Sequence, residues 1–147
     1  MSILDILLGK KVFIETKHLG TFSARIRKNN NSRNIVWSST IEIENYSKEI
    51  VILLEGDILG PEQEEVENTT WIIQNLKLIE KEMLNEIDRN YKLNEKFKHK
   101  NLNELRLSCI YPRDKNLNTI ELSFESTSDD TTGTYAIIQN QKIIEVG

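Results

Sequence analysis

The chain has 147 residues, of which 38% are hydrophobic and 29% charged, and its formal net charge is −4. This composition is typical of one globular domain with a single core and excludes a disordered chain. The acidic balance argues against nucleic-acid binding, and no apolar run of about 18 residues could span a membrane, so no membrane partner is expected. The lone cysteine, Cys109, cannot form an intramolecular disulfide, which favours a reducing, cytoplasmic location.

Residues 1–11 form a short apolar stretch without the basic start or the small-residue cleavage site of a signal peptide. We expect a helical turn or a strand that covers the edge of the core. Residues 12–54 predict a first block of strands, because apolar and polar side chains alternate along them. In this block Phe22 and Trp37 fall on the inward face. Residues 50–54 show no alternation, which predicts a central strand buried on both faces.

Residues 61–92 predict one long helix that packs on the sheet. Pro61 suits the first turn because the N–H that it lacks would have no partner inside a helix there. An apolar stripe from Val66 to Tyr91, with spacings of three, four or seven, marks the face that covers the sheet. At 1.5 Å per residue the helix would be about 45 Å long. That is long for a domain of this size, so a kink or a break is left open.

A second block of strands follows at residues 104–146, and its clearest alternation lies at 119–126. There Ile120, Leu122 and Phe124 fall on the inward face. The whole chain therefore predicts a single α+β domain over residues 1–147. Its architecture is a mostly antiparallel sheet, formed by N- and C-terminal strand blocks (12–54 and 104–146), with one long helix (61–92) packed on it.

The sequence offers few candidate catalytic groups. It contains no phosphate-binding glycine motif and no nucleophile elbow. Cys109 shares the predicted inward face of Leu105 and Leu107, which indicates a buried, inert thiol. Neither His18 nor His99 has another soft metal ligand nearby in sequence, and a zinc site needs at least three protein ligands. We therefore predict no catalytic residues, no metal and no cofactor, and we expect that the protein is not an enzyme.

Charge is unevenly distributed along the chain. Residues 1–40 carry seven bases and two acids, whereas residues 41–67 carry nine acids and one base. The helix dipole accounts for part of this acid run, but the excess fits an anionic patch that would hold a basic protein. Trp71 lies off the apolar stripe of the helix, where it could anchor an interface. The candidate partner-binding residues are Glu55, Asp57, Glu62, Glu64, Glu65, Glu67 and Trp71.

The order of several short motifs resembles a group of uncharacterised bacterial domains of unknown function, over roughly residues 20–147. The matching features are Trp37 in a strand, Gly56-Asp57 and Gly60-Pro61 before the helix, Ile110-Tyr111 after it, and Leu122-Ser123-Phe124-Glu125 ahead of Gly133. Some similar small acidic domains resemble immunity proteins that neutralise toxins, so the resemblance implies protein binding. Such domains often carry a His after the loop glycine, where this chain has Thr134. Any activity that depends on that His is therefore not implied.

The leading prediction is a non-enzymatic, immunity- or inhibitor-like protein-binding module that uses its acidic segment against a basic protein. One alternative is a hydrolase whose site is assembled in space around His18 or His99 and a perturbed carboxylate. Another alternative is a weak nucleic-acid binder that would use the basic N-terminal residues Arg25, Arg27, Lys28 and Arg33. In that case Phe22, which is predicted to face inward, could not stack on bases. The sequence does not indicate the oligomeric state.

Overall fold

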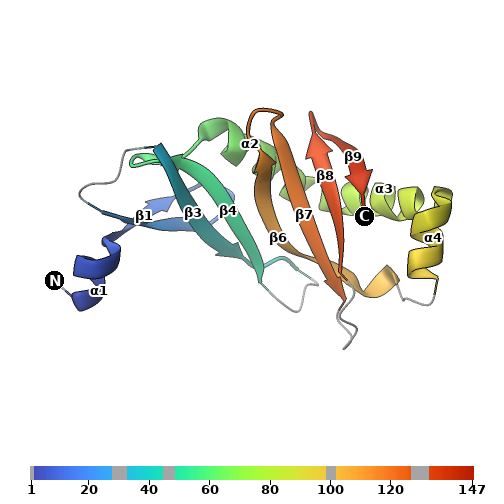
Figure 1. Cartoon of the computed structure of the whole chain (residues 1–147), viewed down its shortest axis with the longest axis horizontal. Helices are drawn as coiled ribbons and strands as arrows, with labels where there is room; N and C mark the ends of the chain where they lie inside the picture. The colour runs from blue at the N-terminus through green and yellow to red at the C-terminus, as the bar shows by residue number, and fades with distance from the viewer. Residues whose placement is uncertain (1, 28–32, 45–48, 99–101, 127–132) are drawn as a thin grey trace.

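The computed structural model describes residues 2–27, 33–44, 49–98, 102–126 and 133–147. It confirms an α+β fold in which a helical segment separates two blocks of strands (Figure 1). A short helix, α1 (Ile3–Leu8), precedes the first block. The strands of that block are β1 (Lys10–Glu15), β2 (Thr21–Ile26), β3 (Arg33–Ile41), β4 (Ile50–Asp57) and β5 (Gly60–Pro61).

The rest of the chain contains the longer helices and the second block of strands. The helices are α2 (Gln63–Gln74), α3 (Leu76–Arg89) and α4 (Tyr91–Phe97), followed by a 3₁₀ turn (Leu102–Glu104). The strands are β6 (Leu105–Asp114), β7 (Thr119–Ser126), β8 (Thr134–Gln139) and β9 (Lys142–Val146).

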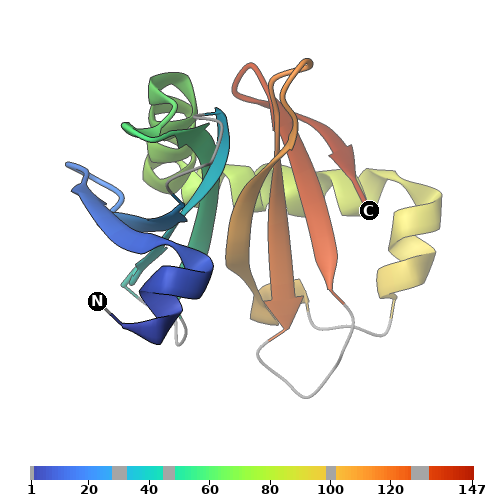
Figure 2. The ribbon, with the colours of Figure 1, turned by 60° about the vertical axis from the view of Figure 1, so that its left-hand side comes forward.

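The nine strands of the described residues form one sheet in the order β1-β2-β3-β4-β6-β7-β8-β9, with β5 paired to β4 outside this path. Neighbouring strands are antiparallel except β4 and β6, whose parallel register joins Val51 to Cys109 and Ile52 to Ile110. Helices α2–α4 form the crossover that a parallel pair requires. Away from this pairing β4 and β6 diverge, so an N-terminal half-sheet (β1–β5) splays from a C-terminal half-sheet (β6–β9), as Figures 1 and 2 show.

The helical segment predicted at residues 61–92 is present, but it begins later than expected. Pro61 does not open the helix, because it pairs with Gly56 in β5. Helix α2 begins at Gln63, with Glu62 as its N-cap residue. The proline therefore ends a hairpin, and its missing N–H does not mark the first helical turn.

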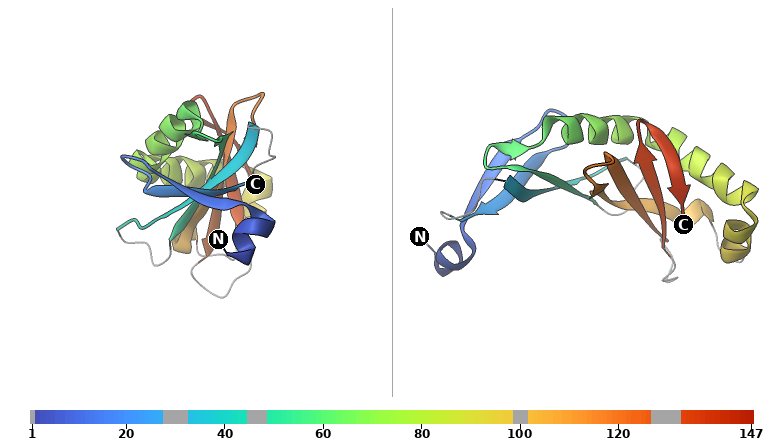
Figure 3. Two further views of the ribbon diagram at one scale, coloured as in Figure 1. Left: turned by 90° about the vertical axis from the view of Figure 1, so that its left-hand side faces the viewer. Right: turned by 45° about the horizontal axis from the view of Figure 1, so that its top comes forward.

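Two asparagines divide the helical segment into three helices, and the third, α4, runs to Phe97, beyond the predicted end at residue 92. Asn75 separates α2 from α3, and its Nδ2 donates to the carbonyl of Trp71 at 2.8 Å. Asn90 separates α3 from α4, and its Oδ1 accepts the backbone N–H groups of Lys92 and Leu93 at 3.1 and 3.3 Å. The bends at these positions let α2–α4 follow the arched sheet, which Figure 3 shows in its right-hand view.

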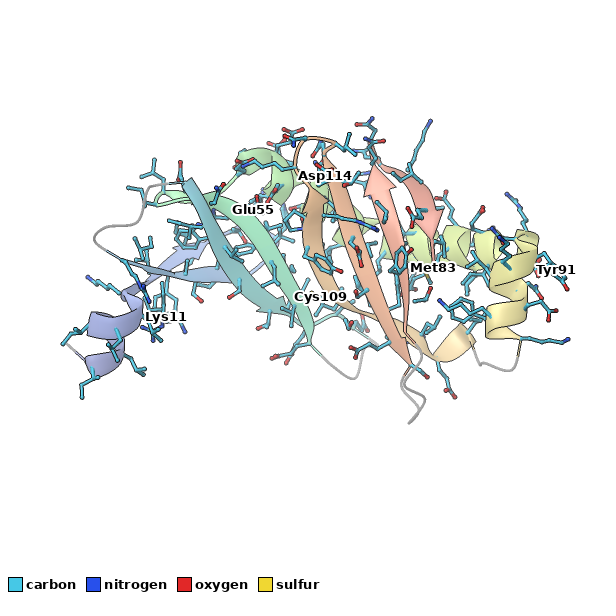
Figure 4. All side chains as sticks on the ribbon, viewed as in Figure 1. Lys11, Glu55, Met83, Tyr91, Cys109 and Asp114 are labelled. Carbon is cyan, nitrogen blue, oxygen red and sulfur yellow. The ribbon has the colours of Figure 1, made fainter. Side chains whose placement is uncertain are left out.

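The core lies between helices α2–α4 and one face of the sheet. Phe22, Trp37 and Phe124 are buried on that face, which confirms the inward positions predicted from alternation. From the helices, Ile79 and Met83 are buried with them, and Met83 lies on α3 beside the C-terminal half-sheet (Figure 4). One core thus runs under both half-sheets.

Helices α2–α4 leave the other face of the sheet uncovered, and we call it the open face (Figure 3). Residues 50–54 form the predicted central strand, but Val51 is 37% exposed on the open face, so the prediction of burial on both faces is wrong. A β-bulge after Leu107 shifts the register and brings Cys109, half-buried, opposite Val51. The predicted inward position of Cys109 is therefore also wrong. Burial, with a contribution from Glu125, raises the pKa of this thiol.

The apolar N-terminal stretch forms α1, one of the two predicted outcomes. It does not cover the edge of the core, however, because none of its residues is buried. In Figure 2 the helix lies in front of the N-terminal half-sheet and projects from it. The expectation of a core-covering role is wrong.

Candidate functional site

A hairpin with an apolar tip joins β4 to β5. We call residues 57–60 the hairpin tip. Ile58 is 47% exposed and Leu59 is 81% exposed. A single exposed leucine is common on protein surfaces, so the importance of the tip depends on how it is held and what surrounds it.

Hydrogen bonds fix the hairpin tip on several sides. Trp37 Nε1 donates to the carbonyl of Asp57 at 2.9 Å, and the backbone N–H of Leu59 donates to Oδ1 of Asp57 at 2.7 Å. The backbone N–H of Glu62 donates to the carbonyl of Glu55 at 2.9 Å and closes the base of the hairpin. The tip is therefore preorganised, which reduces the entropy that binding would cost.

Glu65 supports the hairpin from beneath. Its side chain is only 6% exposed, and its Oε2 accepts the backbone N–H of Glu55 at 2.8 Å. The carboxylate at the start of α2 thus accepts a backbone N–H of β4, which would otherwise lack a partner. Burial raises the pKa of Glu65, although the hydrogen bond from Glu55 opposes the shift. Because it is buried, Glu65 cannot belong to the contact surface that the acid run suggested.

Two contacts tie the start of α2 to the turn between β6 and β7 (residues 115–118). Glu62 forms an ion pair with Lys115, and Oε1 of Glu64 accepts from Nδ2 of Asn118 at 2.9 Å. The hydrogen bond to Glu62 raises the pKa of Lys115. The C-terminal half-sheet thus neutralises one of the clustered acids through a residue that is distant in the sequence.

Three acids near the hairpin lie in solvent. Asp57, Glu64 and Glu67 are exposed, and in the described residues their side-chain hydrogen bonds come from neutral donors. Glu55, labelled in Figure 4 near α2, is half-buried. The candidate acids therefore divide into three that are buried, half-buried or paired and three that are exposed around the hairpin and the first turns of α2.

Two open depressions flank the hairpin tip. The Lys115 depression, of about 510 Å³, lies on the side of the β6–β7 turn and includes Asn34 and Asp57 in its lining. The Trp71 depression, of about 610 Å³, lies between α2 and the β1–β2 turn, with Glu67 in its lining. Leu59 lines both depressions and so stands between them.

The hydrolase alternative gains no site around His18. This histidine is exposed in the lining of the Trp71 depression, and Glu65, whose pKa burial raises, does not line that depression. His99 lies outside the described residues. Within the described part of the chain, no three His, Cys, Asp or Glu side chains come close enough together to hold a metal ion. Trp71, the last candidate residue, is half-buried and packs partly against the core.

The basic residues of the nucleic-acid alternative are only partly described. Nη1 of Arg25 pairs with Oδ1 of Asp5 at 3.2 Å, and Arg27 is exposed at the end of β2. Lys28 and the side chain of Arg33 lie outside the described residues. Phe22 is fully buried, as predicted, so it cannot stack on a base.

The open face of the C-terminal half-sheet is occupied by contacts among its own side chains, which we call the tyrosine network. The hydroxyl of Tyr111 donates to Oε1 of Glu121 at 2.5 Å, and Arg113 lies 3.5 Å from Oε2 of Glu121. The Arg113 guanidinium is 5.8 Å from the ring centroid of Tyr135, whose hydroxyl donates to Oε1 of Glu145 at 2.7 Å. These hydrogen bonds raise the pKa of both tyrosines.

Comparison with known proteins yields no relative: no family model, no curated protein and no solved structure matches the chain. The resemblance to the bacterial domain group therefore stays a prediction from the quoted motifs. No helix in the described residues is long and apolar enough to cross a membrane.

Sequence reasoning missed Ile58 and Leu59, the two apolar residues at the hairpin tip. The signal was the four-residue turn at 57–60, whose two central residues are apolar. Turn positions usually carry Gly, Pro, Asn, Asp or Ser. Two apolar side chains at the centre of a turn point into solvent, so they do not contribute to packing of the core.

Proposed function

We propose that the protein is a non-enzymatic, immunity- or inhibitor-like binding module that recognises a basic protein through the hairpin tip. The observation that carries the proposal is Leu59, an 81% exposed aliphatic side chain on a hydrogen-bonded hairpin between two open depressions. Protein interfaces commonly surround a few apolar anchors with a polar rim, and the anchors supply most of the binding energy.

The proposed surface has Ile58 and Leu59 as its anchors. Exposed carboxylates around them would accelerate the encounter with a basic partner, and this effect would weaken as salt rises. Glu62 and Glu65 support the surface through their internal contacts. The rim consists of Asp57, Glu64, Glu67 and the half-buried Trp71.

The experiment is capture of proteins from a lysate of the source organism at low salt, with wild type compared with Leu59→Asp. Tyr91→Asp is the matched control, because Tyr91 is 78% exposed and lies on α4 at the far end of the molecule (Figure 4). Wild type and Tyr91→Asp should retain the same basic protein, and Leu59→Asp should lose it. Combined Glu64→Lys and Glu67→Lys changes should weaken the capture and reduce its salt dependence.

The proposal fails if no protein is retained by wild type, or if Leu59→Asp and Tyr91→Asp retain the same proteins. A toxin gene beside this one would identify the partner, and its purified product would then replace the lysate. Cytoplasmic binding is part of the proposal, supported by a chain whose one cysteine can form no internal disulfide.

A further inference from the structure

Helix α1 exposes a concentrated set of aliphatic side chains. Five of its six residues are Ile or Leu, and their exposed fractions lie between 45% and 76%. No residue of α1 is buried. Isolated exposed apolar side chains are ordinary, but a contiguous group of this kind marks a surface that meets a partner or a lipid. These residues are Ile3, Leu4, Ile6, Leu7 and Leu8.

Polar contacts hold α1 in this position. Ser2 and Asp5 form a capping box, and Asp5 Oδ1 pairs with Nη1 of Arg25 at 3.2 Å. The same nitrogen donates to the carbonyl of Gly9 at 3.0 Å. Gly9 has φ +88°, and a Cβ there would lie 2.5 Å from the backbone carbonyl of Ile26, so only glycine lets the chain pass this close to β2. The helix is anchored by its polar side while its apolar side chains face solvent.

The apolar surface of α1 is wider than a single stripe. With 3.6 residues per turn, the five aliphatic side chains span roughly 200° of the helix circumference, and Asp5 occupies the remaining side. A helix that packs against a protein typically presents an apolar stripe of about 100° or somewhat more. The broad arc of α1 suits immersion in a fluid apolar medium better than docking in a protein groove.

Exposed basic residues lie close to α1 in the chain and in the neighbouring strand. Lys10 and Lys11 follow α1 after Gly9 and are exposed, and Lys10 pairs in β1 with Ile26, next to the exposed Arg27. Basic side chains beside an exposed apolar helix complement the negative charge of anionic lipid headgroups. The same charges oppose association of two copies through α1 and the β1 edge, since each copy would bring its own lysines to the contact.

We propose that α1 inserts into the interface of an anionic lipid membrane, with Lys10, Lys11 and Arg27 on the headgroups. This revises the expectation of no membrane partner, which rested on the lack of a spanning segment, because an interfacial helix does not span. Strand β1 leads from α1 at Lys10 to Glu15 in the lining of the Trp71 depression. The inserted helix and the hairpin tip are thus at opposite ends of β1, and both can be occupied at once.

The experiment is co-sedimentation of the full chain with lipid vesicles at low salt. The protein should bind vesicles that contain phosphatidylglycerol, and should bind pure phosphatidylcholine vesicles more weakly. Leu7→Asp should lower the partition coefficient by about tenfold or more, because a charge replaces a side chain that inserts. Leu117→Asp, in the β6–β7 turn, is the matched control and should bind as wild type, since Leu117 is 59% exposed and Leu7 62%.

Charge gives a second test on the same vesicles. Combined Lys10→Glu and Lys11→Glu changes should reduce binding to phosphatidylglycerol vesicles by about tenfold or more, and added salt should weaken wild-type binding. Leu59→Asp, which tests the hairpin tip, should leave vesicle binding unchanged. Failure of one proposal can therefore be distinguished from failure of the other.

Three results would overturn the membrane proposal. The first is no binding of wild type to phosphatidylglycerol vesicles at low salt. The second is equal binding of wild type and Leu7→Asp, with circular dichroism showing that both are folded. The third is a wild-type dimer in sedimentation equilibrium that Leu7→Asp dissociates, because a second copy would then cover α1.

Discussion

The two half-sheets share one core but differ on their open faces. In the C-terminal half the tyrosine network engages the polar side chains with one another. In the N-terminal half Phe13 and Val36 are 61% and 56% exposed, and the hairpin tip and α1 add further apolar surface. The difference supports the proposal that the C-terminal half serves as a scaffold and that contacts with other molecules belong to the N-terminal half.

Removal of the largest core side chain in each half should produce the largest effect. Trp37 and Phe124 are 0% and 1% exposed, so Trp37→Ala and Phe124→Ala should each lower the free energy of unfolding by about 3–5 kcal/mol. Urea denaturation followed by circular dichroism measures the loss. Because the core runs under both half-sheets, we expect one cooperative transition in each variant. Hydrogen exchange of Trp37→Ala tests this expectation. If the amides of β6–β9 were protected and those of β1–β4 were not, the two halves would unfold independently.

A methyl group added at Gly56 should displace β5 and so disturb the hairpin tip. An added Cβ would lie 2.0 Å from the carbonyl oxygen of Gly60, so Gly56→Ala must displace β5. We expect a loss of about 1–3 kcal/mol in the free energy of unfolding, together with loss of partner capture. Gly133→Ala, whose Cβ would lie 3.3 Å from the carbonyl oxygen of Phe124, is the control in the other half. Its cost should stay below about 1 kcal/mol, with capture unchanged.

Glu65 should make stability depend on pH. Because burial raises its pKa above the ordinary 4.5, the folded state binds the proton more readily than the unfolded chain. This contribution to stability is greatest at low pH and declines as pH rises from 4.5 through the folded-state pKa. Glu65→Gln keeps an acceptor for Glu55 but cannot ionise, so its stability relative to wild type should rise across that range in urea denaturation.

A companion variant separates ionisation from hydrogen bonding. Glu65→Ala leaves the backbone N–H of Glu55 without its acceptor and should lower the free energy of unfolding by about 1–3 kcal/mol. Identical pH profiles for wild type and Glu65→Gln would contradict the assigned role of the buried carboxyl group.

The smallest effect should come from the tyrosine network. Tyr111→Phe should cost about 0.5–1.5 kcal/mol, since it removes one hydrogen bond on a half-buried face. Glu121→Gln should bring the pKa of Tyr111 down towards its ordinary 10.0, because the contact with Glu121 is the main cause of its raised value. Titration of tyrosinate absorbance measures this shift. If either variant abolished partner capture, the distinction between scaffold and contact half would be wrong.

Alternation in the sequence predicted the inner face of the sheet well. Phe22, Trp37 and Phe124 all lie in the core, because one buried face of a strand leaves a period of two in its apolar residues. The same rule misplaced Cys109, since a bulge after Leu107 shifts the register without a compositional signal. The break at Asn75 was equally hard to locate, because the helix propensity of Asn differs from that of most residues by only a fraction of a kcal/mol.

The sequence indicated the acid run but not how its side chains are arranged. The acid run does lie around one hairpin, but burial removes Glu65 from the surface and Lys115 neutralises Glu62. Both facts depend on contacts between elements, which a local pattern cannot report. Leu59 was missed because hydrophobic periodicity identifies the buried faces of helices and strands, whereas this residue lies in a turn.

The parallel pairing of β4 with β6 has a consequence for how the chain folds. Among the described strands of the main path, every other pairing joins strands that are consecutive in sequence, so each can form by closing a short loop. Pairing of β4 with β6 must close a loop that includes α2, α3 and α4. The chain therefore loses more conformational entropy before any contact between these two strands forms. We therefore expect two hairpin-built halves to form first and to join in a later step, which would set the observed folding rate.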